Sequence, residues 1–364
     1  MKLVTLVGGG TAGHVEPALA VGNWLMANSP DIECDFIGTA TGVEVDLLPK
    51  TNLNFHKILK APLPRRISIS MLIWPVKFLI SVLQSFKALS GSKLVIGFGG
   101  YVSAPVYLAA RIRNIPIIVH EANAKPGWAN KVGARLTDKV TIAFEGARSL
   151  GGRWANAKLV GMPIRPEIMA VGNLSESEIS KLRSELASKL NLNPKAKNIF
   201  IFGGSLGAKR INEVIGASLI ELIDRGYNVI HSVGRSNPIP AARYGYAPLA
   251  YVENMAEIYA ISDLVISRSG AVSCAEIAAV DRYALLIPLP IGNGEQEANA
   301  QDLVASGRAQ ICPNSAFNSD WLMSNLNSLM QNASIQRQRV LHSEDLPADA
   351  IIGQMALEVL GRAN

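Results

Sequence analysis

Short apolar runs, rich in β-branched residues, alternate along the chain with longer stretches of helical periodicity. In the first half these runs cover residues 2–7, 32–38, 93–98, 116–120 and 139–143, and a helical pattern follows each of the first four. Runs this short and continuously apolar are typical of strands buried on both faces of a parallel sheet, with helices as crossover connections. The pattern predicts a doubly wound α/β unit.

The same alternation restarts in the second half. Residues 173–197 are polar and predict an amphipathic surface helix at the head of a new unit. Apolar runs then recur at 198–204, 227–234, 263–268, 283–290 and 308–312. We therefore predict two Rossmann-like domains, residues 1–163 and 164–345, and a last helix within 346–364 that packs on either domain, with the first as the favoured partner.

Composition agrees with two well-packed domains. The chain has 364 residues, 49% of them hydrophobic and 18% charged, which excludes disordered, collagenous and coiled-coil proteins. The three cysteines, Cys34, Cys274 and Cys312, are scattered and form no CxxC pair, so we expect a reducing compartment and no zinc site. No stretch of 18 residues lacks both charge and proline, so we expect no membrane-spanning segment.

Positive charge is concentrated in the first domain. The net charge is +6, from 35 basic and 29 acidic residues; residues 1–163 carry 18 and 9 of these, a charge of +9, which leaves −3 for the rest. Ten basic residues and no acidic one lie between Asp46 and Glu121. Because this block lacks the interleaved aromatics of a nucleic-acid groove, we expect no nucleic acid and favour an anionic membrane surface as its partner.

Three glycine-rich turns, at residues 8–14, 97–105 and 203–210, connect apolar runs to helical patterns. The first matches GxGxxG, but the strand that would hold an NAD ribose ends in Gly38 and Thr39 rather than in an acidic residue, so a dinucleotide site is disfavoured. Glycines and helix N-termini suit phosphate groups, although each turn alone also fits a tight connection. Together they predict a sugar-phosphate ligand in a cleft between the domains.

Seven motifs spread over nearly the whole chain resemble, in the same order, those of the MurG family of glycosyltransferases. They are GGGTAGHVEP, GFGGYVSAP, HEANAKPGWANK, GMPIRP, GGSLGAKRIN, SRSGAVSCAEIA and IGNGEQEANA. The resemblance implies the GT-B fold and an inverting transfer of N-acetylglucosamine from UDP-GlcNAc to the C4 hydroxyl of MurNAc in undecaprenyl-diphosphate-MurNAc-pentapeptide (lipid I), which forms lipid II. It further implies no cofactor, a peripheral location on the cytoplasmic face of the cell membrane, and contacts with other cell-wall synthesis proteins.

Substrate-binding residues follow from the resemblance, position by position. They are Thr11, Ala12, Gly13, Asn123, Arg165, Ser205, Val252, Ala271, Val272, Ser273, Cys274, Ala275, Glu276 and Gln296. Ser205 lies at a predicted helix N-terminus that suits the diphosphate, and Arg165 offers a bidentate fork to phosphate. Glu276 suits a ribose diol. The alternatives are a solvated Glu276 and a structural ion pair for Arg165.

The chain departs from the family pattern at a few positions. Leu206 stands where many members have Gln, so a side-chain hydrogen bond is lost there. Asp281 and Tyr283 replace a usual Gly and Pro, which leaves the shape of that connection open.

His14 is the candidate catalytic base. It is expected at the start of the first helix, whose positive end disfavours imidazolium, and the resemblance points to the same residue. The alternative base is His120, at the end of a predicted strand, and Glu121 beside it would orient a partner or act itself. His14 would then have a capping or structural role. The chain contains no DxD sequence, so we expect no metal, and charge on the leaving group falls to Ser205, helix amides and Arg165.

The segment 61–93 predicts a membrane-facing helix that begins near Ile69. Periodicity assigns one stripe to the core: Leu72, Val76, Leu79, Leu83 and Phe86. Trp74 and Phe78 are expected to enter the lipid headgroup boundary, with Arg65 and Arg66 on anionic lipid. The alternative is a buried helix with incidental basic neighbours.

Two other function classes remain at this stage. One is another GT-B UDP-sugar enzyme, either a glycolipid glycosyltransferase or a UDP-GlcNAc 2-epimerase, which as an epimerase would need no acceptor. The other is a non-catalytic subunit that binds the nucleotide sugar, against which the presence of His14 argues.

Overall fold

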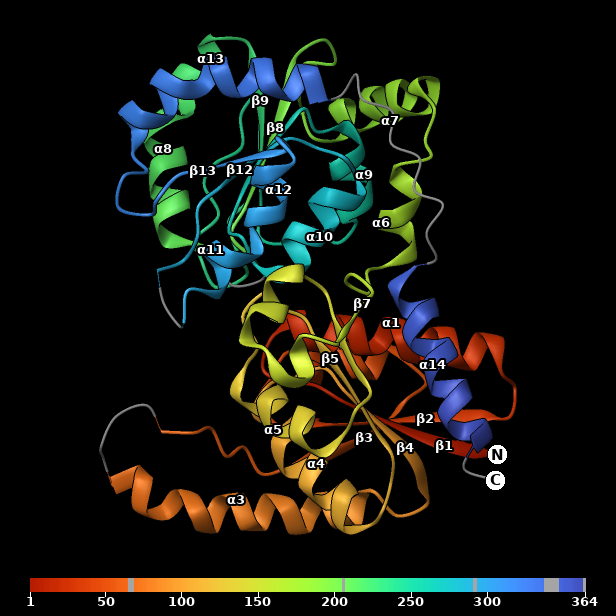
Figure 1. Cartoon of the computed structure of the whole chain (residues 1–364). Helices are drawn as coiled ribbons and strands as arrows, with labels where there is room; N and C mark the ends of the chain where they lie inside the picture. Colours follow the sequence, from red (N-terminus) through yellow and green to blue (C-terminus); the bar gives the residue numbers. More distant parts are fainter. Residues whose placement is uncertain (65–68, 205–206, 291–292, 337–346, 363–364) are drawn as a thin grey trace. The chain divides into compact units, whose positions relative to one another are not determined.

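The computed structural model describes residues 1–64, 69–204, 207–290, 293–336 and 347–362. The chain divides into two compact α/β units (Figure 1). Unit 1 comprises Met1–Ile164 and Asp345–Asn364, and unit 2 comprises Arg165–Glu344.

Unit 1 is built on a parallel sheet of seven strands. They are β1 (Lys2–Val7), β2 (Ile32–Thr39), β3 (Asn54–Ile58), β4 (Ser92–Gly97), β5 (Ile117–Glu121), β6 (Val140–Ile142) and β7 (Lys158–Leu159). Their order across the sheet is β3-β2-β1-β4-β5-β6-β7, so the direction of winding reverses between β1 and β4. The five strands expected from the sequence are present, and β3 and β7 are added at the two edges.

Helices cover both faces of this sheet. They are α1 (Ala12–Asn28), α2 (Glu44–Leu47), α3 (Ile69–Ala88), α4 (Ser103–Ile112), α5 (Trp128–Leu136) and α14 (Ala348–Arg362), with 3₁₀ turns at Leu48–Lys50, Glu145–Leu150 and Gly152–Trp154. Successive residues of β1 point to opposite faces: Leu6 packs in the core under α1 and α14, and Val7 in the core under α4.

The last helix belongs to unit 1, where α14 packs across α1 (Figure 1). A Cβ atom at Gly353 would lie 2.1 Å from the Trp24 ring, so only glycine permits this close approach. The backbone oxygen of Leu360 accepts a hydrogen bond from Lys2 Nζ at 3.2 Å. The end of the chain is therefore tied to its first strand.

Unit 2 repeats the architecture with six parallel strands in the order β10-β9-β8-β11-β12-β13. The strands are β8 (Lys197–Phe202), β9 (Tyr227–Ser232), β10 (Tyr246–Leu249), β11 (Leu264–Ser267), β12 (Ala284–Leu286) and β13 (Ala309–Ile311). The helices are α6 (Pro166–Val171), α7 (Glu176–Lys189), α8 (Lys209–Asp224), α9 (Met255–Ile261), α10 (Ala271–Ala279), α11 (Glu295–Asn299), α12 (Gln301–Ala305) and α13 (Ser319–Gln336). Here the winding reverses between β8 and β11.

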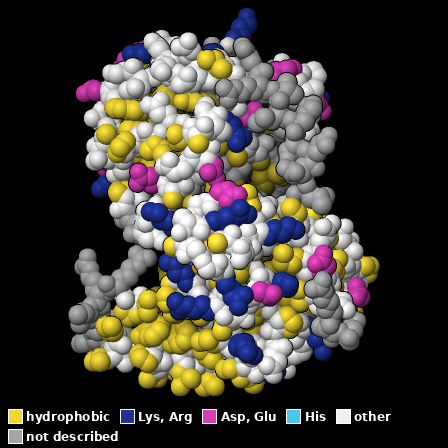
Figure 2. Space-filling view, viewed as in Figure 1, with side chains coloured by type: hydrophobic (Ala, Val, Ile, Leu, Met, Phe, Trp, Pro, Cys, Tyr) yellow, Lys and Arg dark blue, Asp and Glu magenta, His cyan; other side chains and the backbone are white. Residues whose placement is uncertain are grey.

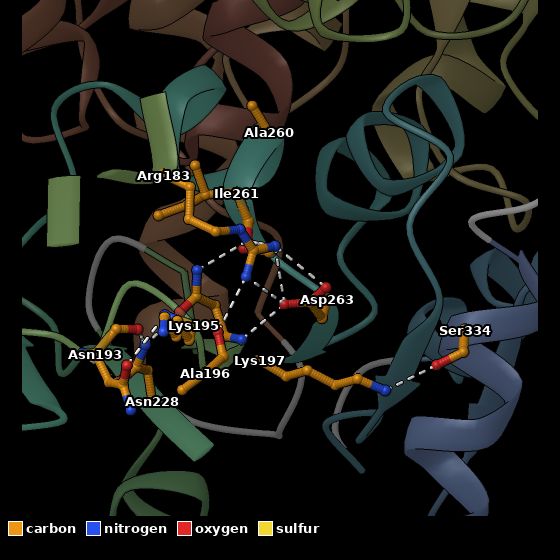
Figure 3. A network of polar contacts seen from close by, with 12 residues as sticks. Arg183, Asn193, Lys195, Ala196, Lys197, Asn228, Ala260, Ile261, Asp263 and Ser334 are labelled. Carbon is orange, nitrogen blue, oxygen red and sulfur yellow. Dashed lines mark hydrogen bonds and ion pairs between the residues drawn. The ribbon is translucent and has the colours of Figure 1, made fainter. Parts of the chain in front are cut away.

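The predicted polar helix is α7, and a polar network anchors it to the sheet of unit 2. Its first turn is closed by a capping box in which Ser175 and Glu178 exchange hydrogen bonds. Figure 3 shows Arg183 beside Asp263, where both terminal guanidinium nitrogens donate to Oδ2 at 3.0 Å, and Arg183 also donates to the Ile261 carbonyl. This network lies at the amino ends of β8 and β11, so the carboxyl ends of the strands are left for ligands.

The structure reverses the face predicted for α3. The stripe assigned to the core is exposed; Leu72 and Leu83, for example, are 80% and 61% exposed. The buried residues are instead Ser81, Val82 and Ser85. Because apolar residues surround almost the whole helix, periodicity could not show which side of α3 faces the protein. The buried serines are small and allow α3 to approach α4 closely.

The predicted membrane residues of α3 lie on its inner side. Trp74 and Phe78 are half-buried and stacked with ring centroids 5.0 Å apart, and both rings lie edge-on to Trp128. The Trp74 indole donates to the Ala61 carbonyl at 3.2 Å. Arg65 and Arg66 lie outside the described residues. Figure 2 shows hydrophobic side chains gathered over α3, with Lys and Arg side chains beside them.

One window of α3, Met71–Ala88, meets the length and composition of a membrane span, with a mean hydropathy of 1.3. Only 17% of this window is buried. Pro75 and Lys77 interrupt this window, and the buried side of the helix packs on α4 of unit 1.

Candidate functional site

The glycine-rich turns lie where parallel α/β sheets bind ligands. The turns after β1 and β4 leave the carboxyl ends of the two strands between which unit 1 reverses its winding, and the turns after β8 and β11 do the same in unit 2. Ligands of doubly wound sheets bind at these switch points, because the connections diverge there and open a crevice. Each unit therefore has a candidate binding site at the carboxyl ends of its strands.

In unit 1 the turn between β1 and α1 carries Thr11, Ala12, Gly13 and His14. Thr11 is exposed and is the N-cap of α1, and the other three lie half-buried in its first turn. The neighbouring β4–α4 turn packs against it: Gly100 has φ +80° and its Cβ position lies 2.3 Å from the Gly9 carbonyl oxygen, so this contact requires glycine. The two turns form one surface around His14.

His14 is held in a state suited to accepting a proton. Its Nδ1 lies 3.1 Å from Thr11 Oγ1. The pKa of His14 is below its ordinary value, chiefly because burial disfavours the imidazolium, while a hydrogen bond to the Gly9 backbone and the charge of Glu44 act in the opposite direction. Burial, rather than the helix terminus expected from the sequence, is thus the main cause of the lowered His14 pKa.

The alternative bases are poorly suited to the role. His120 is completely buried, and this burial lowers its pKa to about 3, which makes it a very weak base. Glu121 is also buried. Its Oε1 accepts a hydrogen bond from the Asn123 backbone N–H at 2.8 Å, and its Oε2 accepts from the Gly127 backbone N–H and from Asn130 Nδ2, both at 3.0 Å. Glu121 therefore shapes the loop that carries Asn123. The Asn123 side chain is half-buried at the carboxyl end of β5.

Unit 2 has a cavity of about 520 Å³ at the carboxyl ends of β8, β11 and β12. Glycines of the β8–α8 turn, the first residues of α8 and two predicted residues, Ser273 and Gln296, line it. Gln296 Oε1 accepts the Leu289 backbone N–H at 2.9 Å. Gly207 has φ +76°, and its Cβ position lies 2.0 Å from the Val233 carbonyl oxygen, so a side chain cannot stand there. A helix N-terminus and basic side chains make this cavity suitable for phosphate groups.

Arg165 and Glu276 are brought together. Arg165, the N-cap of α6, places Nη2 3.2 Å from Glu276 Oε1, and the Tyr259 hydroxyl donates to Oε2 at 3.1 Å. Glu276 is buried and Arg165 is half-buried. The alternative of a solvated Glu276 is therefore wrong, because this carboxylate is buried. The alternative of an ion pair for Arg165 agrees with the structure.

The remaining predicted residues of unit 2 surround the start of α10. Ala271, Cys274 and Glu276 are buried, and Val272, Ser273 and Ala275 are half-buried. Gly270 is the N-cap of α10, so the first backbone N–H groups of the helix have no side-chain cap of their own. Val252 is buried in the connection that precedes α9, which leaves its backbone as the means of contact. Ser205 and Leu206 lie outside the described residues.

Arg268 and Asn314 line the unit 2 cavity but were not among the residues predicted from the sequence. Arg268, which follows β11, donates from Nη1 to Asn314 Oδ1 at 2.7 Å and to the Ile287 carbonyl at 3.0 Å. Burial lowers the pKa of Arg268 below its ordinary value. The available signal was its position in the SRSG motif, as a lone cation directly after a buried strand. Asn314 gave no signal, because it follows no glycine-rich turn.

The departures before β12 leave the fold intact. Asp281 has φ +49°, the left-handed conformation in which the usual glycine is favoured and which Asp tolerates better than most residues. Tyr283 is buried and its hydroxyl accepts from Asn332 at 3.0 Å. Within the described residues there is no group of three or more His, Cys, Asp or Glu side chains that could hold a metal ion.

Comparison with known families matches both halves of the chain. Residues 4–142 match the glycosyltransferase family 28 N-terminal domain, and residues 198–350 match the glycosyltransferase family 28 C-terminal domain.

Two curated relatives share one name, UDP-N-acetylglucosamine–N-acetylmuramyl-(pentapeptide) pyrophosphoryl-undecaprenol N-acetylglucosamine transferase. The chain is 38% identical to that of Frankia casuarinae over 339 residues, 89% of this chain and 86% of the relative. It is 40% identical to that of Corynebacterium diphtheriae over 320 residues, 87% and 85% of the two chains.

Solved structures show the same architecture. MurG of Acinetobacter baumannii superposes with a TM-score of 0.73 at 28% identity, over 98% of this chain and 100% of that one. UDP-GlcNAc 2-epimerase of Neisseria meningitidis, bound to UDP-GlcNAc, reaches 0.65 at 14% identity over the whole of both chains, which is a likeness of fold alone. The expected GT-B fold is confirmed.

Proposed function

The chain belongs to glycosyltransferase family 28, and from this membership we propose that it transfers N-acetylglucosamine from UDP-GlcNAc to lipid I, with inversion, to form lipid II. The observation that carries the proposal is the identity of 38–40% with transferases of this name over nearly nine-tenths of the chain. The epimerase alternative has only a likeness of fold behind it.

We assign UDP-GlcNAc to unit 2. The cavity at the switch point of that sheet offers the amides that begin α8 and the cation of Arg268 to a diphosphate. Glu276, beside Arg165, is the carboxylate proposed for the ribose diol, and Gln296 and the start of α10 contact the rest of the donor.

We assign the acceptor and the base to unit 1. His14 removes the proton from the C4 hydroxyl as its oxygen attacks the anomeric carbon, and the electrons of the breaking C1–O bond leave with UDP. Hydrogen-bond donors and cations of unit 2 stabilise the negative charge that develops on the departing diphosphate.

A two-substrate assay tests this function. Purified protein with UDP-GlcNAc and a short-chain lipid I analogue is expected to release UDP and a disaccharide product, and to release UDP only when both substrates are present. Conversion of UDP-GlcNAc without acceptor would support an epimerase instead. Binding without any turnover would support a non-catalytic subunit.

We further propose that unit 1 binds the anionic surface of the cell membrane, on its cytoplasmic face, through the exposed side of α3. Leu72, Val76, Leu79 and Leu83 are each more than half exposed on this side, and Lys77 and Lys87 are exposed on the same helix. Such a surface inserts apolar side chains at the headgroup boundary while the cations contact anionic lipid. Contacts with other cell-wall synthesis proteins remain an expectation from the resemblance.

The double variant Leu72→Gln/Leu83→Gln is expected to sediment with anionic vesicles about tenfold less than the unchanged protein. A leucine fully buried in lipid contributes about 1.5–3 kcal/mol of apolar transfer, and a tenfold effect corresponds to about 1.4 kcal/mol, so partial burial of the two side chains at the headgroup boundary is enough. Activity on lipid I in bilayers should fall in parallel, and turnover of a water-soluble acceptor analogue should stay unchanged.

The matched control is Ile220→Gln, which removes an Ile that is 55% exposed on α8 of unit 2. It should bind vesicles normally. Equal loss of turnover with both acceptors, together with a lower melting temperature, would mean that α3 contributes to stability and not to membrane binding.

A further inference from the structure

A carboxylate lies buried beneath the turn that carries the proposed base. Glu44, the first residue of the short helix α2, is completely buried. Its Oε2 accepts the Gly10 backbone N–H at 3.1 Å, and its Oε1 accepts both the backbone N–H and the hydroxyl of Thr39, at 2.9 and 2.8 Å. Glu44 therefore joins the β1–α1 turn to the end of β2, although it lies 34 positions after Gly10 in the sequence.

Three glycines make room for this carboxylate. A Cβ atom at Gly42 would lie 1.9 Å from Glu44 Oε2, one at Gly9 2.9 Å from Oε1, and one at Gly38 2.9 Å from Cγ. Gly9 lies in the β1–α1 turn, Gly38 in β2 and Gly42 in the connection from β2 to α2, and these segments meet at the carboxyl ends of the strands. The fold thus closes tightly around a group that is costly to bury, and that cost is offset by the three hydrogen bonds it accepts.

We propose that Glu44 is a positioning residue for the transfer reaction, because it fixes the β1–α1 turn and thereby the place of Thr11 and His14. This inference rests on the proposed function. Gly10, which Glu44 holds, immediately precedes Thr11, and Thr11 Oγ1 in turn contacts the His14 ring at 3.1 Å. A shift of this turn moves the base relative to the acceptor hydroxyl, and a displacement of about 1 Å can cost on the order of 10²-fold in rate.

The charge of Glu44 has a second effect that separates positioning from simple folding. The negative carboxylate favours the imidazolium form and raises the pKa of His14 against the lowering caused by burial. Removing the charge lowers the pKa of His14 further, so the acidic limb of the pH–rate profile moves to lower pH. A group that only stabilised the fold would leave this limb in place.

Two variants and one control test the proposal. Glu44→Asp keeps the charge but is too short to reach Gly10 and Thr39 together; it should lose about 10- to 100-fold in kcat with its acidic limb near the original pH. Glu44→Gln loses the charge and presents an N–H₂ group to one of its donors; it should lose a similar factor and shift the limb to lower pH. Asp46→Asn, which removes an exposed carboxylate from the same helix, should behave like the unchanged protein.

A titration without substrate keeps this test independent of the proposed function. The His14 imidazole, assigned by comparison with a His14→Gln variant, is followed by NMR, and its pKa should be lower in Glu44→Gln than in the unchanged protein and Glu44→Asp. Absence of transferase activity in the unchanged protein would refute the proposed function while this titration still reports on Glu44. An unchanged kcat in both Glu44 variants, or an unchanged His14 pKa in Glu44→Gln, would overturn the inference.

Discussion

Replacing His14 by alanine is expected to lower kcat by roughly 10²–10⁴-fold while UDP-GlcNAc still binds, because a general base contributes about this factor. The binding site proposed for UDP-GlcNAc lies mainly in unit 2, and its residues are unchanged in the variant. Steady-state kinetics with the lipid I analogue measure kcat, and calorimetric titration measures donor binding.

The pH profile of the unchanged protein should carry the signature of this base. Only the neutral ring accepts a proton, so kcat falls as the pH drops through the His14 pKa. Because burial lowers that pKa, the fall is expected below the ordinary histidine value of about 6.5. The acidic limb should be absent from the residual activity of His14→Ala.

The matched control is His56→Ala. His56 is a partly exposed histidine of the same unit, and its Nε2 contacts Asp35 at 2.9 Å. Its loss should leave kcat and the acidic limb unchanged. Near-normal turnover by His14→Ala would contradict the assignment of the base.

Replacing Glu276 by alanine is expected to weaken UDP binding by about 1–3 kcal/mol, which corresponds to roughly 5- to 150-fold in Kd. The loss removes the carboxylate proposed for the ribose diol. It also leaves Arg165 and the Tyr259 hydroxyl without the partner that each now contacts. Calorimetric titration with UDP measures the effect.

Two further variants separate recognition from support of the fold. Glu276→Gln keeps an acceptor oxygen but not the charge, and should lose less UDP affinity than the alanine variant. Glu297→Ala removes an exposed carboxylate of α11 and should bind UDP normally. UDP affinity unchanged in Glu276→Ala would remove this residue from the site.

The central strands and the binding edges follow from sequence alone. Strands buried on both faces, such as β1, β4, β8 and β11, must be continuously apolar, so their pattern is visible without a structure. The glycine-rich turns after them are equally visible, because close backbone approaches tolerate no side chain. Gly207 and Gly100 show this need directly, since a Cβ at either position would overlap a carbonyl oxygen.

Three of the four edge strands, β3, β7 and β10, did not show in the sequence, because much of their surface faces solvent. β3 is buried at only one of five positions, β7 has two residues, both exposed, and β10 is buried at only two of four positions. None of these carries the apolar run that marks a central strand.

Only the tertiary structure decided which side of α3 faces outward and which distant groups support the site. A helix that is apolar nearly all round gives no preferred direction, so contacts with α4 and Trp128 fixed it. Glu44 had no local signal, because its role depends on a hydrogen bond to Gly10 that chain topology brings within reach. The sequence determined the central strands, the glycine-rich turns and the candidate base, because those depend on local chemistry. The packing partners depend on how remote segments meet.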